Sequence, residues 1–175
     1  MRITINYPNI ILNQAMKKTL DRIDNEILAL LRKNARISNK EVAAKVGLAA
    51  STCLVRIRLL QSSGVISGFH AEVNPSSLGV ALQAMIAVRL RRHFTPDVDA
   101  FRKHALSLPE VVQLYHVAGP IDFLIHVWTR DSGHLRDLAM SAFTSREEVS
   151  HIETELIFEH IRSADVPSFT DFDTE

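Results

Sequence analysis

The chain of 175 residues contains a single cysteine, Cys53. One cysteine cannot form an intramolecular disulfide, and it offers no pair of thiols for a CxxC redox or zinc motif. The sequence also lacks a long apolar run. Pro8, Asn9 and Asn13 interrupt the first segment, which is too polar for a signal peptide. We therefore expect a protein of the reducing cytoplasm with no membrane-spanning segment.

Motifs of catalysis and cofactor binding are also missing. The sequence has no GxSxG, P-loop or GxGxxG motif, and its eight histidines show neither HExxH nor the spacing of a structural zinc site. His116 and His126 flank Gly119 on two expected strands and could approach each other, but such histidines are usually packing or surface residues. We expect no enzyme activity, no metal and no cofactor other than a small effector.

The formal net charge is zero, yet the charges are unevenly distributed. Up to Asn74 there are 11 Lys and Arg against 5 Asp and Glu, whereas the rest of the chain has 9 against 15. A basic first half is a reason to look for polyanion binding there. The alternative is a surface on which charges cluster without function.

The basic half predicts three helices. Apolar residues at helical spacing predict the first over Leu20–Lys33. Ser38 and Glu41 form a capping box that starts the second, and Gly47 ends it. A third helix runs from Leu48 until Gly64. Two short helices joined by a tight glycine turn predict a helix-turn-helix.

The third helix has two different sides. Ile57 and Leu60 fall within about 40° of Cys53, and the three face inward. This position favours a packing role for Cys53 over a reactive thiol or redox sensor. The outward side and flanks carry Ser51, Thr52, Val55, Arg56, Arg58 and Ser62. Such a surface is typical of a helix that reads the DNA major groove, and a plain solvated face is the alternative.

Residues after Gly64 predict a β-hairpin around Ser67-Gly68, with Val65, Ile66, Phe69 and Val73 facing the core. A hairpin at this place would be the wing of a winged helix-turn-helix. Asn74–Ser77 then marks a linker.

The acidic half alternates strand and helix patterns in the order βαββαβ, which is typical of the ferredoxin-like fold. Val98, Phe101, Ala105 and Leu108 form the inward side of its first helix. The expected strands are Ala81–Leu90, Val111–Val117, Phe123–Trp128 and His151–Ile161, and the expected helices are Asp97–Leu108 and Ser132–Phe143.

The run LDRIDNEILALLRKNARISNKEVAAKVGLAASTCLVRIRLLQSSGVISGFHAEVNPSSLG resembles the N-terminal half of the Lrp/AsnC (feast/famine) transcription regulators of bacteria and archaea. HVAGPIDFLIHV and VSHIETELIF resemble their effector-sensing domain, so the resemblance covers roughly residues 19 to 162. It implies a nucleoid-associated regulator whose ferredoxin-like (RAM, ACT-related) domain binds an amino acid. It also implies homodimers that assemble into octamers or similar particles.

The resemblance places the effector pocket around the strand-turn-strand from His116 to Phe123, with Gly119 and Asp122 as matched positions. The full set of effector-binding candidates is His116, Ala118, Gly119, Pro120, Asp122 and Phe123. The turn has Gly119-Pro120 where family members often carry glycine followed by an acidic residue, which leaves the effector undefined. A second departure is Ala49-Ala50 in place of the usual Ser-Pro. Because alanine cannot cap, we expect Ser51 or Thr52 to cap a later helix start.

We interpret the chain as a sequence-specific DNA-binding transcription regulator with an α+β fold, in which a small effector modulates DNA affinity or oligomeric state. The alternative is a small-molecule-binding or partner-docking protein that does not bind DNA. The expected DNA contacts are Lys40, Lys45, Ser51, Thr52, Val55, Arg56 and Arg58, on a near-palindromic duplex. The expected domains are an N-terminal extension (1–18), the winged helix-turn-helix (19–74), a linker (75–80), the ferredoxin-like domain (81–162) and an acidic, mobile tail (163–175).

Overall fold

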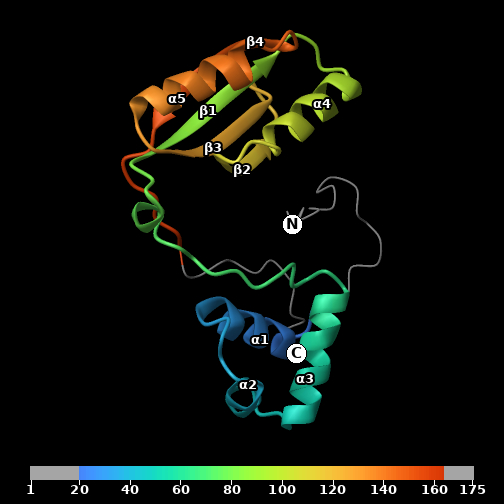
Figure 1. Ribbon diagram of the computed structural model, residues 1–175. Coiled ribbons are helices and arrows are strands. Elements are labelled where there is room, and N and C mark those ends of the chain that lie inside the picture. Colours follow the sequence, from blue (N-terminus) through green and yellow to red (C-terminus); the bar gives the residue numbers. More distant parts are fainter. Residues whose placement is uncertain (1–19, 164–175) are drawn as a thin grey trace. The chain divides into compact units, whose positions relative to one another are not determined.

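The computed structural model describes residues 20–163, which form two compact units divided between Ala71 and Glu72 (Figure 1). Each unit has its own cluster of buried apolar side chains. The expected N-terminal extension lies outside the described residues, as does the expected tail apart from Ser163. Each unit therefore has the separate interior that an independent domain requires.

The first unit consists of three helices around one apolar core. α1 spans Arg22–Lys33, α2 spans Asn39–Lys45 and α3 spans Ala50–Ser62 (Figure 1). All three predicted helices are confirmed. Their shared core consists of Ile27, Leu31, Val42, Ala43, Val46, Cys53 and Leu60.

The predicted signals around α2 are confirmed. The Ser38 side chain accepts a hydrogen bond from the Glu41 backbone, and the Glu41 carboxylate accepts one from the Ser38 backbone. The hydrogen bond from the Ser38 side chain to this carboxylate lowers the pKa of Glu41. Gly47 follows the helix with φ of 70°, a left-handed conformation that costs other residues energy. The tight turn between α2 and α3 follows from this glycine.

The start of α3 differs from the expectation. The helix begins at Ala50, and its N-cap is Ala49, which makes no side-chain cap hydrogen bond. The predicted later start at Ser51 or Thr52 is wrong. An outside contact holds this end instead, since the Asn39 side-chain amide donates to the Ala50 carbonyl at 2.7 Å. This hydrogen bond joins the first residue of α3 to the first residue of α2.

The predicted wing hairpin is wrong. The structure has no strand between residues 65 and 74, and Val65, Phe69 and Val73 are exposed. Of the four residues expected to face the core, only Ile66 packs against it, after its N–H donates to the Leu60 carbonyl. Gly68 does not adopt the positive φ that a type I′ turn over Ser67-Gly68 needs, and no paired strand flanks this dipeptide.

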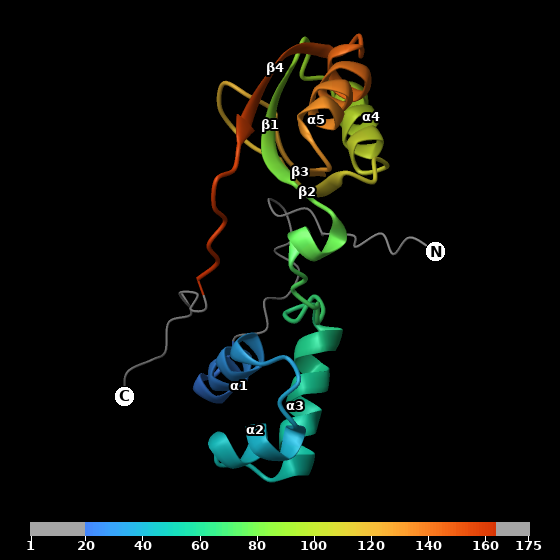
Figure 2. The same cartoon turned by 60° about the vertical axis from the view of Figure 1, so that its left-hand side comes forward.

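The second unit is a four-stranded antiparallel sheet in the order β2-β3-β1-β4, covered by helices. Figure 2 shows α4 and α5 on the same side of the sheet. The predicted βαββαβ order is confirmed. Its elements are the short 3-10 helix η1 (Pro75–Leu78), β1 (Leu82–Leu90), α4 (Thr95–Ala105), β2 (Val111–His116), β3 (Phe123–Thr129), α5 (Ser132–Leu138), the π-helical turn η2 (Ala139–Thr144) and β4 (Val149–Leu156).

Alternate residues of the central strands form the core beneath the helices. Ile86 and Val88 of β1 and Ile125 and Val127 of β3 are fully buried. Phe101 of α4 lies between two aromatic rings, with centroids 4.9 Å from Phe123 and 6.1 Å from Phe143. The predicted inward side of α4 is confirmed, because Phe101 and Ala105 are buried while Val98 and Leu108 pack against the core.

Several boundaries differ from the expectation. The helix expected over Asp97–Leu108 is α4, which covers Thr95–Ala105. The last strand covers Val149–Leu156 rather than His151–Ile161. It starts earlier because a bulge in β1 lets Val149 pair with Leu90. It ends earlier, where Leu156 pairs with Ala84, and one further hydrogen bond, from the Ile157 N–H to the Gln83 carbonyl, follows the strand. The helix expected over Ser132–Phe143 changes to π geometry at Ala139. Among residues 20–163, no helix has both the length and the apolar character needed to cross a bilayer.

The uncapped α3 start gives a stability prediction. Ala49 has φ of −65° and ψ of 143°, the extended conformation of an N-cap residue. Ala49→Ser should therefore raise the free energy of unfolding of this unit by about 0.5–2 kcal/mol, measured by thermal unfolding followed by far-UV circular dichroism. Ala50→Ser is the matched control because it adds the same hydroxyl inside the first turn. Equal stabilities of the two variants would contradict the prediction.

Candidate functional site

The outward side of α3 is an exposed polar surface. Ser51, Thr52, Val55 and Arg58 are exposed, and Val55 retains 62% of its accessible area. Cys53 and Leu60, on the other side, are fully buried, and Ile57 packs against the same core. The predicted division of the helix into two sides is confirmed.

Arg58 is available for an external partner. Within residues 20–163 its guanidinium makes no hydrogen bond or ion pair, and its side chain is exposed. Lys40 and Lys45 of α2 are exposed as well. The structure thus leaves cationic groups on both helices of the helix-turn-helix free to approach a polyanion.

Arg56 is used inside the unit. Its Nη1 donates to Asp21 Oδ2 at 2.6 Å and to Asp24 Oδ1 at 2.9 Å, joining α3 to the start of α1. The Asp24 side chain is only 1% exposed, whereas that of Arg56 is 29% exposed. Hydrogen bonds to Asp21 and then to Asp24 raise the pKa of the guanidinium. The arginine therefore neutralises a buried carboxylate.

Sequence reasoning missed the partner of Arg56. Asp24 stands three residues before Ile27 and seven before Leu31, on the side of α1 that the core covers. A carboxylate on an apolar helix side is the signal that a cation must lie opposite.

Cys53 is a packing residue. Its side chain is fully buried, and burial raises the pKa of its thiol. A raised pKa disfavours the thiolate, which is the reactive form. These observations oppose the redox-sensor alternative.

The ion pair predicts a loss of stability in Arg56→Ala. Removing the cation leaves the buried Asp24 carboxylate with one fewer charged hydrogen-bond partner, so the free energy of unfolding should fall by about 1–3 kcal/mol. Urea unfolding followed by far-UV circular dichroism measures this change. Arg58→Ala is the control and should unfold like the wild type, within about 0.5 kcal/mol. An unchanged stability in Arg56→Ala would show that the pair contributes nothing.

The β2–β3 turn brings the predicted effector residues to one end of the sheet. His116, Ala118, Gly119 and Pro120 are exposed there, and Gly119 has φ of 143°, which side-chain-bearing residues rarely adopt. The His116 ring stacks on that of Phe123 at 4.8 Å, and Phe123 is fully buried. Exposed backbone next to a stacked aromatic pair forms the outer surface of this turn.

Asp122 fastens the turn to the neighbouring strand. Its N–H donates to the Val88 carbonyl, and its Oδ2 accepts from the Leu90 N–H at 2.7 Å. Its Oδ1 lies 2.6 Å from Nδ1 of His93, a partner that sequence reasoning missed. Both carboxylate oxygens are therefore used within the unit, and the side chain is buried.

The two histidines considered for a metal have separate surroundings. His126 Nε2 lies 3.1 Å from Gln83 Oε1, which also accepts from Trp128 Nε1, and its ring lies near that of His160. His116 contacts Phe123 instead. In the part of the chain that the structure describes, no group of three or more His, Cys, Asp or Glu could hold a metal ion.

The environment of His126 predicts a pH dependence. Burial, with a smaller contribution from the nearby His160, lowers the pKa of His126 below its ordinary value of 6.5. The unfolded chain thus holds this proton more tightly, and stability should fall as pH drops below the unfolded-state value. Urea unfolding followed by Trp128 fluorescence measures the free energy of unfolding at pH about 7.5 and about 5.5. Between these two values, His126→Gln should lose less of this free energy than the wild type does. His151→Gln changes an exposed histidine and is the control, so its pH dependence should match that of the wild type. If His126→Gln loses as much free energy of unfolding as the wild type, His126 is not the cause of the pH dependence.

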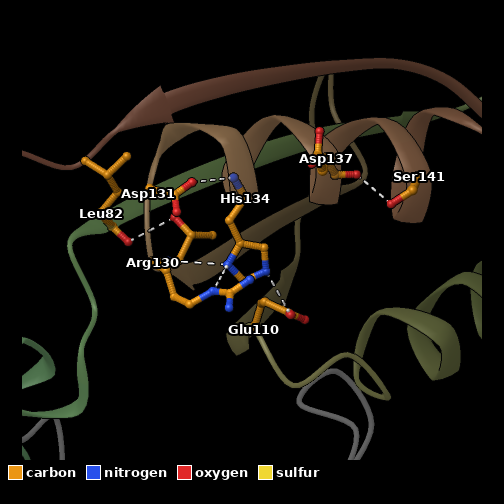
Figure 3. A network of polar contacts seen from close by, with 8 residues as sticks. Leu82, Glu110, Arg130, Asp131, His134, Asp137 and Ser141 are labelled. Carbon is orange, nitrogen blue, oxygen red and sulfur yellow. Dashed lines mark hydrogen bonds and ion pairs between the residues drawn. The ribbon is translucent and has the colours of Figure 1, made fainter.

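A further polar network joins β2, β3 and α5 (Figure 3). His134 Nδ1 accepts from the backbone N–H and from Nε of Arg130, each at 3.4 Å, and its Nε2 lies 3.2 Å from Glu110 Oε1. Asp131 caps α5 by accepting from the His134 N–H. Because both ring nitrogens connect secondary-structure elements, we interpret this histidine as structural.

The comparisons with known proteins agree with this architecture. Residues 20–67 match the family of winged helix-turn-helix DNA-binding domains, and residues 83–167 match the Lrp/AsnC ligand binding domain. The HTH-type transcriptional regulator AldR of Mycolicibacterium smegmatis is 41% identical over 147 residues, which are 84% of this chain and 86% of that protein. The leucine-responsive regulatory protein of Escherichia coli K12 is 33% identical over 148 residues, 84% of this chain and 90% of that protein.

Solved structures show the same likeness. A transcriptional regulator from Neisseria meningitidis, determined in complex with L-Met, superposes with a TM-score of 0.76 at 27% identity, covering 83% of this chain and 94% of that one. AsnC of Escherichia coli superposes with a TM-score of 0.73 at 26% identity, covering 82% and 97%.

A helix-turn-helix unit followed by a βαββαβ ligand-binding unit defines a DNA-binding transcription regulator that responds to a small molecule. The chain belongs to the Lrp/AsnC family of transcriptional regulators. This membership favours the DNA-binding interpretation over the partner-docking alternative, and it identifies a regulator rather than an enzyme.

Proposed function

We propose that α3 is the recognition helix and that it reads a near-palindromic operator through Arg58, Ser51, Thr52 and Val55. The observation that carries this proposal is the exposed, unpaired guanidinium of Arg58 beside these small side chains. A guanidinium can bond guanine edges, a hydroxyl can reach phosphate, and the valine methyls can meet the methyl group of thymine. Lys40 and Lys45 add salt-dependent attraction to the phosphates.

The first turn of α3 supports an additional contact of this helix with a DNA phosphate. No side chain caps its first N–H groups, and the hydroxyls of Ser51 and Thr52 are exposed beside them. Free N–H groups at the positive end of a helix attract an anion. In this proposal Arg56, one of the predicted DNA contacts, acts indirectly by holding α3 against α1.

The sheet face opposite the helices supports a homodimer. It presents Met85, Leu124 and Trp128 as half-buried side chains and Tyr115 as an exposed one. A second copy of the chain would cover this mixed apolar face. We propose that dimers place two recognition helices about 34 Å apart, one turn of duplex, and assemble further into octamers or similar particles.

We propose that the effector is an amino acid bound at the β2–β3 turn, in a cytoplasmic protein. Two relatives support this class of ligand: one is named leucine-responsive, and one was solved with L-Met. The exposed backbone of Ala118, Gly119 and Pro120 offers hydrogen-bonding groups for a small polar ligand. Binding would change DNA affinity only through unequal affinity for two states of the assembly.

The recognition-helix assignment predicts that Arg58→Ala weakens specific DNA binding. Loss of a base contact should reduce operator affinity by about 1–3 kcal/mol. Mobility-shift titrations across a range of salt concentrations, on an operator selected from random duplexes, measure the affinity and its salt slope. Arg136→Ala, an exposed arginine of α5, is the control and should bind like the wild type. An unchanged affinity and salt slope in Arg58→Ala would remove this residue from the interface.

A native mass spectrum of the full chain tests the assembly and the effector together. With a panel of common amino acids, it should show dimers or multiples of dimers carrying a bound amino acid. A monomer that binds none of them would contradict both parts of the proposal.

A further inference from the structure

One end of the sheet carries a concentrated run of basic residues. Arg89, Arg91, Arg92 and His93 follow one another where β1 ends, although the chain after Asn74 has only 9 Lys and Arg against 15 Asp and Glu. β4 begins beside this end, as Figure 1 shows. A hollow of about 400 Å³ opens there, lined by Arg89, Leu90, Arg91, His93, Ser150 and His151. Its volume lies in the range of small-molecule sites.

The two arginines of the lining keep donors free. Within the described residues, the Arg89 guanidinium makes no hydrogen bond or ion pair, and the Arg89 main chain is fixed by its strand pairing. Arg91 Nε donates to the Glu147 carbonyl at 2.9 Å, and the Arg91 N–H donates to the Glu148 carbonyl at 2.8 Å. These bonds position Arg91 and leave its two terminal nitrogens unused.

No carboxylate lines this hollow, and three of the neighbouring acids, Asp122, Glu148 and Glu153, have partners of their own. Asp122 binds the Leu90 N–H and His93, and Glu153 lies 3.2 Å from His151 Nε2. Glu148 pairs with Arg146 in the adjoining hollow. No residue of this lining therefore neutralises Arg89 or Arg91, although Arg91 also borders the adjoining hollow, which Asp97 and Glu147 line.

We propose that this hollow binds a small dianion that is held by both the Arg89 and the Arg91 guanidinium, either through two carboxylates or through the oxygens of one phosphate. A guanidinium pairs with a carboxylate or a phosphate through two parallel hydrogen bonds, and two guanidinium groups match a ligand with two such groups. The concave shape, and the acidic side chains Asp97 and Glu147 in the adjoining hollow, favour a small ligand over the extended backbone of DNA.

The hollow is connected to the β2–β3 turn through His93. This residue lines the hollow and bonds Asp122, which in turn fastens the turn to β1. A ligand that displaces His93 would therefore change the support of the turn. This regulatory link rests on the proposed function, whereas dianion binding itself does not.

Isothermal titration of the full chain tests the site. Succinate and inorganic phosphate are the probes, and acetate at the same ionic strength is the monovalent control. Succinate or phosphate should bind the wild type, and Arg89→Gln should bind it at least about tenfold more weakly, because one bidentate pair is lost. Arg136→Gln removes the same charge from α5 and should bind like the wild type. Comparison of the two probes separates carboxylate from phosphate recognition.

Two results would contradict the proposal of a dianion-binding site. One is a wild type that binds neither probe more tightly than acetate, and the other is an equal loss of binding in Arg89→Gln and Arg136→Gln. A loss of operator affinity in Arg89→Gln, without binding of either probe to the wild type, would assign these arginines to DNA instead. Because operator binding by Arg58→Ala is measured separately, failure of the dianion site leaves the recognition-helix proposal standing.

Discussion

The arrangement of the first unit depends on one buried carboxylate. Asp24 lies among the apolar residues of α1, and a buried charge is stable only when a partner neutralises it. Arg56 supplies that partner from α3, so the rotation of α3 about its own axis is constrained by an ion pair as well as by the packing of Cys53 and Leu60. With this rotation set, Arg58 and Val55 face outward.

The second unit uses a buried aspartate in a comparable way. Asp122 holds the β2–β3 turn to the end of β1 through Leu90 and His93. In each unit, then, a buried acidic side chain, Asp24 or Asp122, makes hydrogen bonds within the unit, while a nearby segment remains exposed. These hydrogen bonds hold two exposed segments in place, namely the turn of Gly119 and Pro120 and the outward side of α3.

Much of this architecture follows from local patterns in the sequence. The capping box of Ser38 and Glu41, the positive-φ Gly47 and the inward stripe of Cys53, Ile57 and Leu60 act over a few residues, so the sequence predicts them correctly. The errors arise where distant residues decide. β4 begins at Val149 because a bulge in β1 shifts the pairing, and the first residue of α3 is bonded to Asn39 of another helix. The hairpin prediction failed because the alternation around Gly68 could not reveal its backbone conformation.

The candidate DNA-binding site shows the same contrast between local patterns, which the sequence reveals, and contacts of distant residues, which it does not. The periodicity of α3 indicated which side of the helix faces outward, but not that Arg56 on its flank is bound by Asp21 and Asp24 from another helix. By residue type alone, Arg56 and Arg58 are equivalent candidates for DNA contacts. Only the three-dimensional contacts show that the first is bonded inside the unit and the second is exposed.

A structure of the protein bound to its operator duplex tests this separation most directly. The account predicts Arg58 within hydrogen-bond distance of a base edge or phosphate, with Arg56 still bonded to Asp24. A complex in which Arg56 leaves Asp24 to contact a base, while Arg58 points into solvent, would contradict it.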